Sequence, residues 1–294
     1  MNTLKKLICI ILISMQAPFA WSQDCTAHFE AEAGPDIDVC EGGTVVFGST
    51  MGGDATEAVW KGGKGFFEPN RNTLNAEYTP SEDETGTTVV LTLEASNHKF
   101  SSCPAAKSSI KLTVNSIVVV NAGDDIRVCA GNTVHLRGAV TQGKAKSTAW
   151  ITNGSGTFDD VHRLDAIYTP SKDDIEKAAL SIMLTAEPFG VCLPDSNTLI
   201  VMIDAVPMVT ITPDIYVENL NPINLTARIV GGSGEIQWSS SGTGTFENPG
   251  RKDAVYNPSA ADMKNGSINL SVFVSSINGR CNSKKQAKLH FAGK

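Results

Sequence analysis

Cysteines are the residues of this chain whose type and spacing most directly predict a chemistry, namely disulfide formation. Lys5 and Lys6, the apolar run "LICIILISM" and a small-x-small site ending at Ser22 predict an export signal over residues 1–22. An exported chain meets an oxidising compartment, where cysteines pair. Cys9 leaves with the signal, and an even number of cysteines remains: Cys25, Cys40, Cys103, Cys129, Cys192 and Cys281.

A lipid anchor on Cys25 is the alternative interpretation of the start of the mature chain. It is disfavoured because Asp24 directly precedes Cys25, where a lipoprotein signal carries a small residue. No later segment is apolar enough to cross a membrane. We therefore predict an exported protein of the periplasm, the cell surface or the extracellular space.

The other reactive residues do not form a recognisable catalytic or metal-binding pattern. The sequence has no GxSxG, HExxH or paired cysteine–histidine signature, and "GKGF", "GSGTF" and "GTGTF" precede no predicted helix that could hold a phosphate. We predict that the protein is not an enzyme and has no cofactor. The histidines fall at unrelated positions and imply no metal cluster: His28, His98, His135, His162 and His290.

Acidic residues gather in "GPDID", "GDDIR", "SEDE" and "SKDD". Calcium held between β-modules would require several converging oxygen ligands, and the acidic positions shift between copies. We interpret these residues as solvated turn acids and keep Ca²⁺ as an alternative. The formal charge of −7, or −9 without Lys5 and Lys6, argues against nucleic acid as a partner.

A repeat of about ninety residues fills the mature chain. Each copy has a tryptophan, a tyrosine 18 residues later that directly precedes "TPS" or "NPS", and a cysteine 24 or 25 residues after the tyrosine. We predict domains at 23–115, 116–205 and 206–294, called modules 1, 2 and 3. The repeated aromatics are predicted core residues: Trp60, Trp150, Trp238, Tyr78, Tyr168 and Tyr256.

The strand pattern predicts an all-β fold of three tandem immunoglobulin-like sandwiches. Seven short apolar segments per copy are separated by Gly, Pro, Asn and Asp turns, and no helical period of useful length occurs. Alternation is clearest in the sixth segment, whose predicted inward residues in module 1 are Val89, Leu91, Leu93 and Ala95. Module 2 repeats it with Leu180, Ile182, Leu184 and Ala186, and module 3 with Ile268, Leu270, Val272 and Val274.

The chain resembles the immunoglobulin-like and PKD-like modules of secreted and surface proteins of Bacteroidota, including gliding-motility adhesins. The likeness rests on "AGPDIDVCEGGTVVF", the W…GxGxF segment, "YTPSxxD" and the cysteine before the last strand, and it covers the whole mature chain. It departs in module 3, where Glu218 replaces the first cysteine. The resemblance implies a spacer or adhesive role.

Two disulfide schemes follow from the spacing. The internal scheme pairs Cys40 with Cys103 and Cys129 with Cys192, but a regular sandwich would place these cysteines at opposite ends, roughly 20 Å apart, beyond the reach of a disulfide. The preferred scheme joins successive modules. It pairs Cys25 with Cys103, Cys40 with Cys192, and Cys129 with Cys281, and module 3 needs no first cysteine because no module follows it in this sequence.

We therefore predict a stiff, disulfide-bonded rod that acts as a spacer, an adhesin or a subunit of a cell-envelope assembly through contacts with a protein partner. Phe100 and Phe189, beside cysteines, would pack either on a neighbouring module or on their own sandwich. The alternative function is a carbohydrate-binding or enzyme-accessory module, which would show solvent-exposed aromatic side chains.

Overall fold

A computed structural model describes residues 25–231 and 234–292. The predicted export signal, residues 1–22, lies outside this part. Within it, no helix has the length and apolarity that a membrane crossing requires. The chain divides into two compact units, and the boundary between them falls between Val114 and Asn115. The second unit contains both module 2 and module 3.

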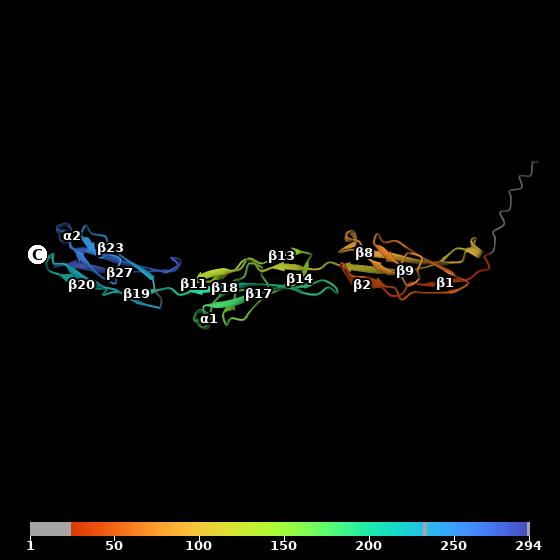
Figure 1. Ribbon diagram of the computed structural model, residues 1–294, viewed down its shortest axis with the longest axis horizontal. Helices are drawn as coiled ribbons and strands as arrows, with labels where there is room; N and C mark the ends of the chain where they lie inside the picture. The colour runs from red at the N-terminus through yellow and green to blue at the C-terminus, as the bar shows by residue number, and fades with distance from the viewer. Residues whose placement is uncertain (1–24, 232–233, 293–294) are drawn as a thin grey trace, which may run out of the picture. The chain divides into compact units, whose positions relative to one another are not determined.

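Module 1 is an all-β sandwich, as predicted (Figure 1). One layer is a four-stranded sheet of order β2-β9-β8-β5, and the other holds β3-β7-β6 and the pair β1-β4. The strands are β1 (Phe29–Glu32), β2 (Ile37–Cys40), β3 (Val45–Val46), β4 (Thr50–Gly53), β5 (Glu57–Lys61), β6 (Phe66–Glu68), β7 (Glu77–Thr79), β8 (Thr88–Ser96) and β9 (Ala106–Asn115).

Module 2 repeats this plan, with sheets β11-β18-β17-β14, β12-β16-β15 and β10-β13. A short helix, α1 (Lys172–Lys177), follows "YTPS". The strands are β10 (Val119–Asn121), β11 (Ile126–Cys129), β12 (Val134–His135), β13 (Ala139–Gln142), β14 (Ala145–Thr152), β15 (Thr157–Phe158), β16 (Ile167–Thr169), β17 (Ala179–Pro188) and β18 (Asp195–Asp204).

Module 3 has the sheets β20-β27-β26-β23, β21-β25-β24 and β19-β22. Helix α2 (Ala260–Asn265) corresponds to α1. The strands are β19 (Met208–Thr210), β20 (Asp214–Val217), β21 (Ile223–Thr226), β22 (Arg228–Val230), β23 (Gly234–Ser240), β24 (Thr245–Glu247), β25 (Asp253–Asn257), β26 (Ser267–Ser276) and β27 (Asn282–Phe291).

The count of seven strands per module was wrong, because in module 1 the strands β2 and β4 lie outside the predicted segments. Around Gly34, whose φ of +98° suits glycine, the chain leaves β1, which pairs with β4, and enters β2, which lies beside β9. The chain is likewise interrupted around Gly48, between β3 and β4. The first strand of a module therefore contributes to both layers, which a regular seven-strand path did not anticipate.

The alternation predicted for the sixth segment is present. Leu91, Leu93 and Ala95 are fully buried, and Val89 is partly buried. In modules 2 and 3 all four corresponding residues are buried. Three separate clusters of buried residues lie between residues 33 and 114, 118 and 203, and 209 and 291, so each module has a core of its own.

Candidate functional site

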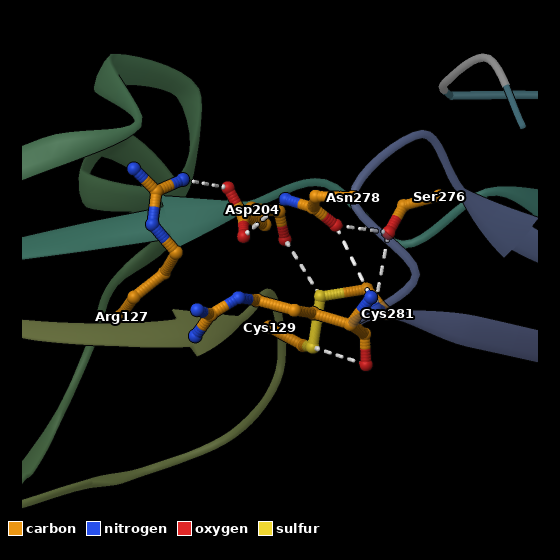
Figure 2. The surroundings of a disulfide bond; sticks show 7 residues. Arg127, Cys129, Asp204, Ser276, Asn278 and Cys281 are labelled. Atoms are coloured by element: carbon orange, nitrogen blue, oxygen red, sulfur yellow. Dashed lines mark hydrogen bonds and ion pairs between the residues drawn. A yellow bond between two sulfur atoms is a disulfide. The ribbon is translucent and has the colours of Figure 1, made fainter.

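The contact between modules 2 and 3 is held by a disulfide (Figure 2). Cys129, the last residue of β11, is bonded to Cys281, just before β27, with an S–S distance of 2.02 Å and a Cα–Cα distance of 5.6 Å. Cys129 is therefore not bonded to Cys192 within its own module. Its position follows from the divided first strand, because β11 runs parallel to β18 and places Cys129 opposite Asp204 at the end of the module.

One carboxylate links the two modules beside this disulfide. Asp204 Oδ1 lies 2.7 Å from Nη1 of Arg127, on β11 of the same module. Asp204 Oδ2 accepts a hydrogen bond of 3.0 Å from the Asn278 side chain of module 3 (Figure 2). Both oxygens are thus engaged, and hydrogen bonds to a charged group are among the stronger ones.

The module 3 side of this junction is a tight turn between β26 and Cys281. The Cys281 amide donates to Ser276 Oγ at 3.1 Å, and Ser276 Oγ donates to Asn278 Oδ1 at 2.6 Å. Gly279 has a φ of +69°, which L side chains rarely adopt. After the turn, Ser283 Oγ donates to the Pro207 carbonyl of the connecting segment. These bonds order the turn that presents Asn278 and Cys281 to module 2.

Module 1 contains the disulfide Cys25–Cys103, with a Cα–Cα distance of 5.1 Å. It ties the segment before β1 to the turn after the short helix His98–Phe100. The pairing of Cys40 with Cys192 stays a prediction. Cys192 is buried, and its Sγ lies 3.4 Å from the Asn115 carbonyl.

Each module also contains a buried tyrosine–carboxylate cluster. In module 2 the Tyr168 hydroxyl donates to Asp174 Oδ2 at 2.7 Å. The Ser171 amide donates to the same oxygen at 2.9 Å, and the Ser155 amide donates to Oδ1 at 2.9 Å. The Gly156 amide donates to the tyrosine oxygen at 2.8 Å. The cluster therefore joins the "GSGTF" hairpin to the start of α1.

Modules 1 and 3 repeat the cluster with the same six-residue spacing. Tyr78 donates to Glu84 at 2.7 Å, and Tyr256 donates to Asp262 at 2.7 Å. The acids are 0–4% exposed. Glu84 of "SEDE" and Asp174 of "SKDD" are thus buried structural groups, and their interpretation as solvated turn acids was wrong. The shared tyrosine-to-acid spacing was the signal that could have identified them.

Hydrogen bonding keeps the cluster carboxylates charged. Burial alone would raise the pKa of Asp174, but the amides of Ser155 and Ser171 and the Tyr168 hydroxyl outweigh burial and lower the pKa to about 2. Asp262 has the same balance, and its pKa is also about 2.

The pKa values of the cluster tyrosines are raised rather than lowered. Burial, followed by the hydrogen bond to the neighbouring carboxylate, raises the pKa of Tyr78 and Tyr168 to about 12. These hydroxyl groups are fixed donors rather than acids that could release a proton near neutral pH. The cluster therefore has a structural role.

The three predicted core tryptophans also have a common environment. Trp60, Trp150 and Trp238 are at most 3% exposed. Each indole Nε1–H donates to a backbone carbonyl in the loop before the tyrosine strand, at 3.0, 2.8 and 3.0 Å. Together with the fully buried Tyr78, Tyr168 and Tyr256, they leave no stacking platform at these positions.

The remaining sequence candidates do not converge on one site. In the described part of the chain no group of three or more His, Cys, Asp or Glu could hold a metal ion. His28 and His98 lie beside Glu30 and Glu57, respectively, at 3.1 and 2.8 Å. Phe100 and Phe189 are 36% and 54% exposed, and Phe189 shares an open groove of module 2 with Lys144, Lys146 and His162.

No protein-family model and no curated protein matches the chain. Among solved structures, it is similar to the N-terminal eight Ig domains of Down Syndrome Cell Adhesion Molecule, at 13% identity and a TM-score of 0.43 over 90% of this chain and 42% of that chain. It therefore spans less than half of that structure.

Two further structures show a similar degree of likeness. Extracellular domains 3–5 of Drosophila OTK match at 10% identity and a TM-score of 0.38, over 91% of this chain and 97% of that chain. Protocadherin Gamma B2 extracellular cadherin domains 3–6 match at 10% identity and a TM-score of 0.37, over 91% and 73%. The chain is thus similar to tandem Ig and cadherin domains.

Proposed function

We propose that this protein is an exported, non-enzymatic structural or adhesive protein that works through protein–protein contacts. The observation that carries the proposal is the junction between modules 2 and 3. A disulfide, an ion pair and a cross-module hydrogen bond converge there. Neighbouring domains usually move against one another, so a junction held in this way favours a spacer over a flexible string of domains.

The finer proposal is a stiff spacer, adhesin or cell-envelope subunit of the Bacteroidota type that the sequence resembles, with a role such as that of the gliding-motility adhesins. Its partner would be a protein of the envelope or cell surface. A stiff protein loses less conformational entropy when it binds, which suits a component that must present contacts at a fixed spacing.

The experiment that tests this role is crosslinking of the exported protein in intact cells, followed by mass spectrometry. We expect discrete partners in the envelope or surface fraction. The variant Cys129→Ser/Cys281→Ser, which keeps each module core, should give weaker or more heterogeneous crosslinks. Unchanged crosslinks in the variant would show that the clamped junction is irrelevant to the role.

The alternative function, carbohydrate binding, is favoured by one observation. Tyr216 of module 3 is 75% exposed and stacks on His290 with a centroid distance of 4.7 Å, and a flat exposed ring of this kind can receive the C–H face of a sugar. A glycan array separates the two functions. A specific glycan hit lost in Tyr216→Ala would replace the structural role by a lectin-type role.

A further inference from the structure

The charges of this chain are distributed unequally among the modules. Residues 23–115 contain 14 acidic and 6 basic side chains, a formal charge of −8. Residues 116–205 contain 11 and 7, a charge of −4, and residues 206–294 contain 6 and 9, a charge of +3. The first and third modules therefore have opposite charge.

In module 3 two lysines lie on the exposed face of the sheet β20-β27-β26-β23, where one acid, Asp214, lies opposite Lys288. Lys284 and Lys288 point outward from β27, because the alternate residues Ala287 and Leu289 are buried. Phe273, opposite Lys284 on β26, is 41% exposed, and Tyr216 is 75% exposed on β20. We call Tyr216, Phe273, Lys284 and Lys288 the basic face.

The corresponding sheets of the other modules differ at these positions. In module 1, Glu94 takes the place of Phe273, opposite Lys107, and their charged groups lie 2.8 Å apart. In module 2 the opposed pair is Thr185 and Ser196. In module 3 Lys284 faces a ring, and the described residues include no ion pair of Lys284 or Lys288.

Module 1 presents an apolar and acidic surface on its other sheet, β3-β7-β6. Val46 and Phe66 are 65% and 63% exposed. Glu77 on β7 lies opposite both Val46 and Glu68. Two carboxylates directly opposite each other repel, and the ion pairs of the described residues include neither. We call Val46, Phe66, Glu68 and Glu77 the acidic face.

The acidic face is also peculiar to its module. At the position of Glu77, modules 2 and 3 have Ile167 and Val255. At the position of Phe66 they have Thr157 and Thr245. The chain thus has one acidic, aromatic face and one basic, aromatic face, on modules whose net charges are opposite.

We propose that the acidic face of one molecule binds the basic face of a second copy of this chain. Lys284 and Lys288 would neutralise the opposed carboxylates Glu68 and Glu77, and the exposed rings of Phe66, Phe273 and Tyr216 would be covered. The inference deepens the proposed structural function, on which it rests, by naming a partner. Because the two faces differ, each copy can give one contact and receive one, so copies join either in a closed assembly, the reciprocal dimer included, or in an open chain.

Sedimentation velocity of the full mature chain at low and high salt tests this contact. We expect a weight-average mass that rises with protein concentration at low salt and falls to that of the monomer when the charges are screened. A monomer at every concentration and salt would overturn the proposal, while leaving other protein partners, and thus the proposed function, untouched.

Charge exchange locates the contact. Glu68→Lys/Glu77→Lys and Lys284→Glu/Lys288→Glu should each be monomeric, and an equimolar mixture of the two should associate again. The matched controls are Glu82→Lys/Asp83→Lys and Arg251→Glu/Lys252→Glu, which make the same changes of charge at other exposed positions of modules 1 and 3. The controls should associate like the wild type.

Two further outcomes would overturn the proposal. If the controls lose association as the face variants do, net charge rather than these faces drives it. If the wild type stays monomeric but binds alginate, an acidic polysaccharide, and Lys284→Glu/Lys288→Glu abolishes that binding, the basic face is a glycan site instead.

Discussion

The interiors of the three modules have the same contacts, whereas their outer sheet faces have different residues at corresponding positions. Inside, each module has the same tyrosine–carboxylate bond of 2.7 Å and the same tryptophan donating to a loop carbonyl. Outside, the position of Glu94 in module 1 is taken by Thr185 in module 2 and Phe273 in module 3. The fold depends on the repeated interior, so what distinguishes the modules functionally should lie on their surfaces.

The largest effect expected from this comparison concerns the buried tryptophan. Trp60→Ala should lower the free energy of unfolding of module 1 by about 3–5 kcal/mol, because it removes a fully buried ring and a hydrogen bond. Chemical denaturation checks this. The control Tyr216→Ala removes an exposed ring and should change stability by less than about 0.5 kcal/mol. Similar losses in both variants would contradict the division between interior and surface.

The disulfide of the second junction should have the next largest effect. Cys129→Ser/Cys281→Ser should lower the stability of the unit formed by modules 2 and 3 by roughly 2–4 kcal/mol, and calorimetry should resolve the two modules as separate transitions. A single unchanged transition would show that Asp204 and the linking segment suffice to couple them.

A non-reducing peptide map by mass spectrometry checks the remaining pair. We expect peptides that link Cys40 to Cys192, because the other four cysteines of the mature chain are paired as Cys25–Cys103 and Cys129–Cys281. A link from Cys40 to any other cysteine would contradict the predicted scheme.

The next effect in size is the loss of stability that acid should cause at the tyrosine–carboxylate clusters. The pKa of Asp174 falls from an ordinary 3.8 to about 2 in the folded protein, so its contribution is complete above about pH 4 and is lost as the pH falls through about 2. The shift corresponds to roughly 2 kcal/mol. Asp174→Asn should remove this pH dependence from module 2, measured by denaturation between pH 5 and pH 2.

The control for this experiment is the neighbouring exposed acid. Asp173→Asn should leave both the stability and its acid dependence nearly unchanged. If Asp173→Asn and Asp174→Asn change the free energy of unfolding and its pH dependence equally, the buried cluster contributes no more to stability than an exposed acid does.

The smallest effect belongs to the outer faces. Glu94→Gln removes the carboxylate of an ion pair with Lys107; the Lys107 side chain is 62% exposed and the Glu94 side chain 25% exposed. Because water reaches the Lys107 end of the pair, it contributes about 0.2–1 kcal/mol, and thermal denaturation should barely change. A large loss would show that the outer face of module 1 also contributes to its folding.

Much of the architecture could be predicted from local pattern. The alternation at Leu91 and Leu93 and the fixed spacing of tryptophan and tyrosine follow from side chains that face one core, and the sequence records such periodicity directly. The division of the first strand between two layers could not be predicted, because it depends on a backbone bend at Gly34. The strand β2, which ends at Cys40, was therefore missing from the regular sandwich on which the disulfide schemes were based.

The buried acids were missed for a different reason. "SEDE" and "SKDD" have the composition of solvated loops, and only the geometry shows that Glu84 and Asp174 fold inward to receive a tyrosine hydroxyl and backbone amides. The internal disulfide scheme could be disfavoured from the sequence, because the length of a strand separates the two cysteines. The Asp204–Asn278 hydrogen bond could not be predicted, because it depends on a tertiary contact that no local pattern encodes.

The bond between Cys25 and Cys103 has a consequence for how this array could grow. Cys103 occupies in module 1 the position that Cys281 occupies in module 3, where the thiol is used to attach the preceding module. In module 1 that attachment point is occupied by Cys25, from the segment before β1. A thiol reductant that supplies two electrons to the Cys25–Cys103 bond would release Cys103 as a thiol, so in the oxidised protein this short segment occupies the position through which module 3 is joined to module 2.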